Sequence, residues 1–124
     1  MPKSEHAEQV NFIHKAKKYL RGNGNDYMVP LLFAIPNGGK RDTQTAASLK
    51  MEGVRAGVPD LFFAKPNKTA CGLFIEMKKV SGGTVSKDQK KMLEALSDEA
   101  YVCRVARGAD QAIQILKDYV EDKI

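Results

Sequence analysis

The sequence predicts one α/β domain, spanning residues 1–124, in which helices flank a mixed sheet of about four strands. Short runs of apolar and aromatic residues, bounded by turn-forming residues, indicate the strands. Apolar residues at helical spacing, with capping residues and glycines at the ends of the segments, indicate the helices. A helix between the third and fourth strands predicts a βαβ crossover, which makes those two strands parallel.

The first helix is expected to begin near Ser4, as its N-cap, and to run to about Arg21, where a Gly-Asn-Gly-Asn segment stops it. At 100° per residue, one face carries an apolar stripe with Glu5 on the same side and Glu8 at its margin. The stripe consists of Ile13, Ala16 and Leu20, with Phe12 at its flank. Acidic residues in a first turn also stabilise the positive end of a helix by about 0.3 to 1 kcal/mol, so either glutamate has a purely structural explanation.

A strand over residues 31–35 is expected next, ended by Pro36, which cannot continue a ladder in a central strand. An Asn-Gly-Gly turn follows and leads into Lys40 and Arg41. Exposed backbone N–H groups and two cations at a turn can receive a phosphate, although the same residues also describe a simple solvated loop. A short helix is then expected from residue 42 or 43 to residue 52.

The middle of the chain predicts a hairpin whose strands carry charge. Its two apolar runs cover residues 57–64 and 73–78, and the segment between them is rich in turn formers. If Phe62 pairs with Phe74, then Asp60 lies opposite Glu76, and Lys78 joins them because side chains alternate between the faces of a strand. Two carboxylates and an ammonium group would then converge in an interior strand.

Charges in an interior strand need an explanation, because removing an ion from water costs several kcal/mol unless it is paired or binds a metal. Two close carboxylates supply the hard oxygen ligands that Mg²⁺ takes together with substrate phosphate. A neighbouring lysine can orient or deprotonate a water molecule. A buried salt-bridge cluster, or an edge strand with a solvated face, remains open as the structural alternative.

The second half of the chain predicts a helix opening at Ser86, a strand over residues 101–106, and a last helix from residue 109 or 110 to about 121. Ser86 and Gln89 fit a capping box, in which each side chain bonds the backbone of the other residue. Gln89 also falls on the side that faces the sheet, so either this structural role or a role in the site explains it.

Composition narrows the classes of function. Twenty Lys and Arg against fifteen Asp and Glu give a net charge of +5, which favours a polyanionic partner such as nucleic acid. Two cysteines make neither a disulfide framework nor a zinc site. The sequence has no signal-like apolar segment and no apolar run of membrane-spanning length, so we expect no membrane partner.

Several motifs together resemble one nuclease family. Asp60 after Pro59, with Glu76-Met77-Lys78 sixteen residues on, is similar to the signature of the PD-(D/E)xK nuclease superfamily. With three further runs, the chain resembles the VRR-NUC (virus-type replication-repair nuclease) family, in particular its small stand-alone members from phages and prophages. Those runs are Pro36 to Arg41, Glu52 to Asp60 and Ser86 to Gln89.

This resemblance implies the restriction-endonuclease-like fold and a Mg²⁺-dependent DNA endonuclease, with Mn²⁺ as a substitute. It implies a structure-specific enzyme similar to Holliday-junction resolvases, which acts on branched or four-way DNA as a homodimer in the cytoplasm of a bacterium or phage-infected host cell. An inactive nucleic-acid-binding module of the same fold is the alternative. The residues implied are Asp60, Glu76 and Lys78 for catalysis; Asp60, Glu76, the Met77 carbonyl and Glu5 or Glu8 for the metal; and Lys40, Arg41, Lys79 and Gln89 for nucleic acid.

Overall fold

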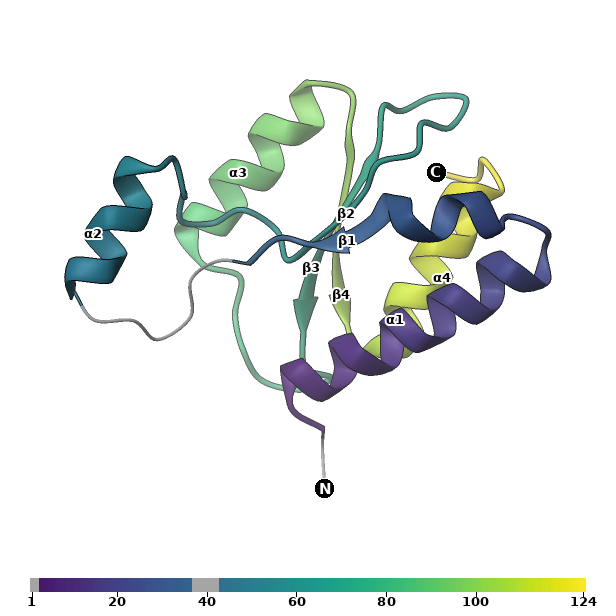
Figure 1. The fold of residues 1–124 in the computed structure, drawn as a ribbon, viewed down its shortest axis with the longest axis horizontal. Helices are drawn as coiled ribbons and strands as arrows, with labels where there is room; N and C mark the ends of the chain where they lie inside the picture. Colours follow the sequence, from purple (N-terminus) through teal and green to yellow (C-terminus); the bar gives the residue numbers. More distant parts are fainter. Residues whose placement is uncertain (1–2, 37–42) are drawn as a thin grey trace.

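A four-stranded mixed sheet forms the centre of the molecule, with helices on both faces, as the sequence predicts (Figure 1). The computed structural model describes residues 3–36 and 43–124. In chain order the elements are α1 (Glu5–Gly22), the 3₁₀ helix η1 (Asp26–Leu31), β1 (Leu32–Ala34), α2 (Thr43–Met51), β2 (Leu61–Phe63), β3 (Leu73–Lys78), α3 (Lys87–Asp98), β4 (Val102–Arg107) and α4 (Ala109–Val120).

The strands lie in the order β1-β2-β3-β4. β2 is antiparallel to both β1 and β3, whereas β3 and β4 are parallel and are joined through α3. The predicted hairpin and the predicted βαβ crossover are therefore both present. In the hairpin Phe62 lies opposite Phe74, which is the register that the sequence predicts.

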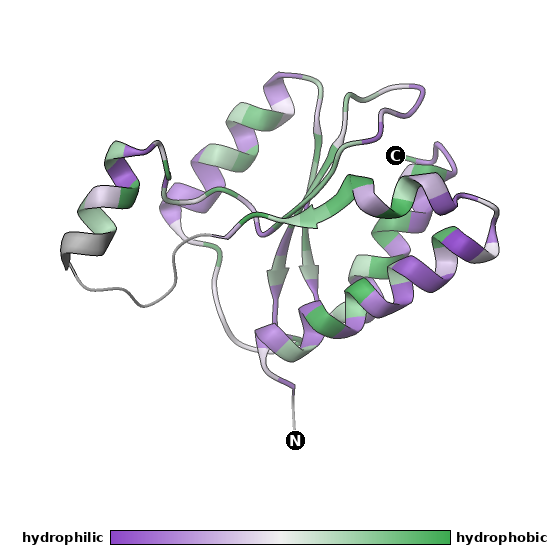
Figure 2. Cartoon of the chain, viewed as in Figure 1, coloured by the Kyte–Doolittle hydropathy of each residue, from purple (hydrophilic) through white to green (hydrophobic). Residues whose placement is uncertain are grey.

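The hydrophobic core lies between the sheet and the pair α1 and α4. Apolar and hydrophilic residues alternate along both helices, and the apolar ones face the sheet (Figure 2). Alternate residues of β2 and β3 point into this core. Its fully buried side chains include Phe12, Ala16, Leu20, Leu61, Phe63, Leu73, Ile75, Met77, Leu116 and Tyr119. On α1, Phe12 is buried and Ile13 only partly buried, so the centre of the apolar stripe is shifted from the predicted one.

α3 lies on the other face of the sheet and packs against β4, while α2 projects from the body beyond the start of α3 (Figure 1). Ser86 caps α3 in the predicted capping box: its Oγ accepts from the Gln89 N–H at 3.1 Å, and Gln89 Oε1 accepts from the Ser86 N–H at 2.9 Å. No side chain of α3 is fully buried. α3 thus covers this face less tightly than α1 and α4 cover the core face, although the β3 residues beneath it are themselves buried.

Two local features differ from the sequence prediction. The segment before β1 forms the 3₁₀ helix η1 with Pro30 inside it, so β1 begins at Leu32 and is only three residues long. Short 3₁₀ segments have no apolar periodicity that would mark them in a sequence. In addition, none of the described helices combines the length and the hydrophobicity that a bilayer span needs.

Candidate metal centre

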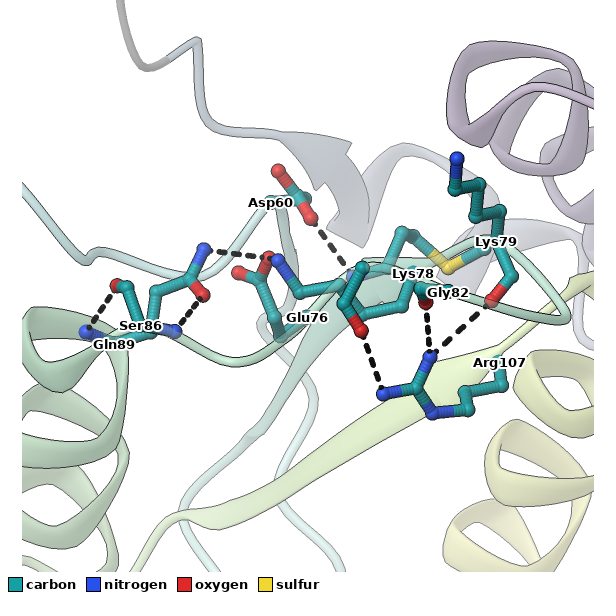
Figure 3. Close-up of polar contacts among 10 residues, drawn as sticks. Asp60, Glu76, Lys78, Lys79, Gly82, Ser86, Gln89 and Arg107 are labelled. Carbon is teal, nitrogen blue, oxygen red and sulfur yellow. Dashed lines mark hydrogen bonds and ion pairs between the residues drawn. The ribbon is translucent and has the colours of Figure 1, made fainter.

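The hairpin places Asp60 and Glu76 side by side. Asp60 directly precedes β2, and its backbone carbonyl accepts from the Ile35 N–H at 2.7 Å, which prolongs the pairing with β1 by one residue. Its side chain turns toward β3, where Oδ2 accepts from the Met77 N–H at 2.8 Å (Figure 3). The backbone N–H groups of Ile35 and Met77 thus hold Asp60 from both sides, and its carboxylate lies next to that of Glu76.

The first turn of α1 brings a third carboxylate to the same place. One oxygen from each of Glu5, Asp60 and Glu76 lies within 4.8 Å of the other two. Glu5 is exposed, and it follows Ser4, whose Oγ caps α1 by accepting from the Ala7 N–H at 3.1 Å. The three residues come from separate elements, so the cluster depends on the packing of α1 against the sheet.

Glu76 is the most buried member of the cluster, with 2% of its surface exposed. Its Oε2 accepts from Gln89 Nε2 at 2.9 Å and lies 3.4 Å from Lys78 Nζ (Figure 3). Its Oε1 is buried and has no hydrogen-bond partner among the described residues. Burial raises the pKa of Glu76 to about 8, the negative charge of Asp60 adds to the rise, and Lys78 opposes it.

These features fit a divalent cation. A buried carboxylate oxygen without a partner costs free energy, and a second carboxylate beside it adds repulsion. A metal ion removes both costs because it supplies a partner for Oε1 and neutralises the charges. Three carboxylates of mixed exposure form the hard oxygen donor set that suits Mg²⁺, and the exposed Glu5 leaves that side open to water and to a ligand.

Lys78 completes the constellation from the last position of β3. It is 8% exposed, and its backbone carbonyl accepts from the Gly108 N–H at 2.9 Å, which fixes the end of the strand. The predicted convergence of Asp60, Glu76 and Lys78 is therefore present. Met77 points its side chain into the core, and a role for its carbonyl as a metal ligand remains a prediction.

Gln89 touches the carboxylate cluster directly. Because its Oε1 is held by the Ser86 N–H, its amide has a fixed orientation with Nε2 directed at Glu76. The sequence left two roles for Gln89 as alternatives, capping α3 and contacting the site. In the structure its side chain does both. The structure puts the amide on the carboxylate, so the predicted nucleic-acid contact has to compete with this bond.

Glu8 lies away from the three carboxylates. It is 6% exposed, and its Oε1 accepts from the Ala109 N–H at 3.2 Å, which caps the N-terminal end of α4. Of the two glutamates left open by the sequence, the structure therefore places Glu5 at the candidate centre and gives Glu8 a structural partner. Of the residues predicted to contact nucleic acid, Lys79 is exposed beside Lys78, whereas Lys40 and Arg41 lie outside the described residues.

Two residues support the site in ways that the sequence did not predict. Gly57 abuts the first turn of α3, where a Cβ would lie 2.5 Å from the Asp88 carbonyl oxygen. Arg107 pairs with Lys78 in the register of β3 and β4 and contacts the segment that follows Lys78. The run around Gly57 carries a signal, a glycine three residues before Asp60, but nothing local to Arg107 indicates its partners.

The comparisons with known proteins agree with this fold. The model of the VRR-NUC domain family matches residues 31–110. A solved structure described as a "VRR_NUC domain protein" superposes with a TM-score of 0.83 at 26% sequence identity, covering 98% of this chain and 91% of that one. No curated protein sequence matches. The matched range includes Asp60, Glu76, Lys78 and Gln89, and the structural superposition extends to α1.

Proposed function

The chain belongs to the VRR-NUC domain family, a family of nuclease domains, and from that premise we propose that it is a Mg²⁺-dependent endonuclease that hydrolyses phosphodiester bonds in DNA. The observation that carries the proposal is the convergence of Glu5, Asp60 and Glu76 around a buried carboxylate oxygen that has no partner among the described residues. A structural salt-bridge cluster would pair its buried oxygens, and this one leaves Glu76 Oε1 unpaired.

In the proposed site Asp60 and Glu76 hold the metal, and Glu5 completes the acidic shell from α1. When bound, Mg²⁺ supplies Lewis-acid chemistry: it polarises the scissile phosphate, lowers the pKa of water and neutralises charge on the leaving oxygen. Mn²⁺, which also takes oxygen ligands in octahedral geometry, is expected to substitute.

The residues of the chain contribute position and charge. Lys78 orients the attacking water and stabilises charge on the phosphate, because its Nζ lies 3.4 Å from Glu76 Oε2 and is therefore close to any ligand of that carboxylate. Gln89 holds Glu76 in one rotamer through its fixed amide. Both residues lie on the face of the sheet away from the core, where a DNA backbone can approach the exposed edge of the cluster.

Contacts to DNA beyond the metal are proposed for Lys79, which is exposed next to Lys78, and for Lys40 and Arg41, which precede α2 in the sequence. Phosphate contacts from such cations position a duplex without reading its sequence. The net charge of +5 supports this mode of binding.

We further propose branched DNA, in particular a four-way junction, as the preferred substrate, cut by a homodimer. Resolution of a junction requires two cuts in opposing strands, and a two-fold pair of these domains supplies two sites with matching polarity. Sedimentation of the pure protein is expected to give about twice the monomer mass. A strictly monomeric species at micromolar concentration contradicts paired cleavage.

Cleavage of labelled DNA tests the proposal. We expect cuts in four-way junctions, and fewer in duplex, flap and splayed substrates, when Mg²⁺ or Mn²⁺ is present, and none with EDTA. Asp60→Asn, Glu76→Gln and Lys78→Met variants should still bind the junction in EDTA. Binding without any metal-dependent cut by the wild-type chain would instead identify an inactive nucleic-acid-binding module of the same fold. Efficient cutting of every substrate alike would keep the nuclease and refute the preference for junctions.

A further inference from the structure

Arg107 ends β4, next to the last residue of β3. In the parallel register it is the partner of Lys78, so both side chains leave the sheet on the same face. The Arg107 side chain does not point to solvent. Its Nη1 donates to the Gly82 carbonyl at 2.7 Å and to the Lys79 carbonyl at 3.5 Å, and its Nη2 donates to the Gly83 carbonyl at 3.0 Å (Figure 3).

These three carbonyls belong to the segment 79–83, which follows Lys78 and which we call the lysine loop. All five of its residues are exposed, and it lies outside helices and strands. Gly82 and Gly83 have φ values of 77° and 67°, so the loop turns through two left-handed residues in succession. An exposed glycine-rich segment has few conformational restraints of its own, and the guanidinium supplies three contacts across it.

The lysine loop folds back over the lysines. A Cβ built on Gly82 would lie 3.4 Å from Lys79 Cε, and one built on Gly83 would lie 4.0 Å from Lys78 Cδ. Gly82 therefore lies beside the side chain of Lys79, and Gly83 lies beside the side chain of Lys78. A displacement of the loop would consequently change the surroundings of both lysine side chains.

We propose that Arg107 is a positioning residue for the nuclease site: it locks the lysine loop against β4, so that Lys78 is held at Glu76 and Lys79 is presented to the DNA backbone. This inference rests on the proposed function and deepens it. The planar guanidinium can bond several carbonyls at fixed angles, whereas an ammonium group on the same stem cannot reproduce that fork.

Three variants of the full-length chain test the proposal. Arg107→Gln removes the charge and the fork, and Arg107→Lys keeps the charge but not the fork. Arg104→Gln is the matched control, because Arg104 lies on the same strand, is exposed, and donates to the Cys103 carbonyl and not to the lysine loop. For each variant we would measure backbone NMR order parameters over residues 79–84, kcat and KM on a labelled four-way junction, and the thermal midpoint.

Both Arg107 variants should lower the order parameters of the loop from about 0.85, the value of rigid backbone, to below about 0.6, because the restraint on its carbonyls is lost. In both, kcat should fall about tenfold or more, because small displacements of a catalytic group are costly, while KM changes less. The Arg104 variant should match the wild type in order parameters, kcat and KM.

Other outcomes overturn the proposal. Unchanged order parameters in Arg107→Gln would show that the guanidinium does not order the loop. Full activity in Arg107→Lys would show that the positive charge suffices and that the fork does not position the loop. A lower thermal midpoint with unchanged kcat would show that Arg107 only stabilises the fold. If the wild-type chain cuts no DNA, the proposed function fails and the catalytic part of this inference falls with it, while the order parameters still decide whether Arg107 orders the loop.

Discussion

The two faces of β3 are almost equally closed to solvent, yet they carry opposite chemistry. On one face, apolar residues pack against α1 and α4. On the other face, the side chains at alternate positions along the strand are a phenylalanine, a glutamate and a lysine. All six residues have 9% exposure or less: Leu73, Ile75 and Met77 face the core, and Phe74, Glu76 and Lys78 face the side of α3. Burial alone therefore does not separate a structural face from a functional one.

The difference lies in how burial is compensated. Burying Ile75 stabilises the fold by about 1.5 to 3 kcal/mol. Burying Glu76 costs several kcal/mol, and its partners Gln89 and Lys78 engage only Oε2. The core face thus contributes stability, whereas the α3 face buries a carboxyl group whose Oε1 has no partner among the described residues, and a bound cation would supply one. Variants on the two faces should separate these roles.

The largest effect is expected for Glu76→Gln. The substitution keeps the shape of the side chain but removes a proposed metal ligand and its charge. Cleavage should therefore fall by at least about a thousandfold, because the site would bind the catalytic metal more weakly. Single-turnover cleavage of a four-way junction with Mg²⁺ measures the loss. Circular dichroism serves as the control for folding. Full activity would remove Glu76 from the mechanism.

On the opposite face, Ile75→Ala should act on stability. Removing buried methyl groups from a close-packed core lowers the free energy of unfolding by about 2 to 5 kcal/mol. Urea titration in EDTA measures this loss, and the cleavage rate of the fraction that remains folded should stay close to that of the wild type. If Glu76→Gln destabilised the metal-free protein as much as Ile75→Ala, the charged face would be a structural ion pair and the contrast between the two faces would disappear.

The same contrast explains how much of the fold the sequence could predict. Strand alternation and turn residues determine the hairpin register, so the pairing of Phe62 with Phe74 followed from local pattern. The capping box at Ser86 is equally local. The helix η1 was missed because a 3₁₀ turn around Pro30 has no periodicity to detect.

The sequence predicted the part of the candidate site that one hairpin brings together. It left open the residues that reach the site only when distant helices pack against the sheet. Glu5 and Glu8 are three residues apart on one helix, and periodicity alone does not say which one reaches the sheet. The choice is made by α4, because the N–H of its first residue, Ala109, donates to Glu8. The bond from Gln89 to Glu76 likewise requires α3 to dock on the sheet at one depth.

A pH titration of stability sharpens the contrast for Glu76. Its pKa is raised from 4.5 to about 8 in the folded, metal-free protein, so between these values the folded state binds more protons than the unfolded state. The free energy of unfolding should therefore fall as the pH rises from about 5 to 8. Urea titrations in EDTA of the wild type and Glu76→Gln measure the effect, because only the wild type carries this titration. Parallel pH profiles of the two proteins would contradict the raised pKa, and added Mg²⁺ should restore stability to the wild type at pH 8.

The smallest expected effect concerns the depth at which α3 docks. Gly57 has a φ of 87°, and a Cβ there would lie 2.5 Å from the Asp88 carbonyl oxygen and 2.9 Å from the Gln89 nitrogen. In Gly57→Ala the first turn of α3 has to move, which withdraws the Gln89 amide from Glu76. We expect cleavage to slow about tenfold, or about 1.4 kcal/mol in the barrier.

Gly53 provides the matched control for this displacement. Its φ of 101° imposes a comparable backbone strain on alanine, but no described atom lies within 4 Å of its Cβ position. Both variants should lose about 1 to 2 kcal/mol of stability from the left-handed conformation, measured by urea unfolding. Only Gly57→Ala should lose activity beyond that, because only there does the new methyl group press on α3. Equal cleavage rates in the two variants would show that the α3 face tolerates a shift of Gln89, and that the buried charge of Glu76 is held in place by Asp60 and Lys78 alone.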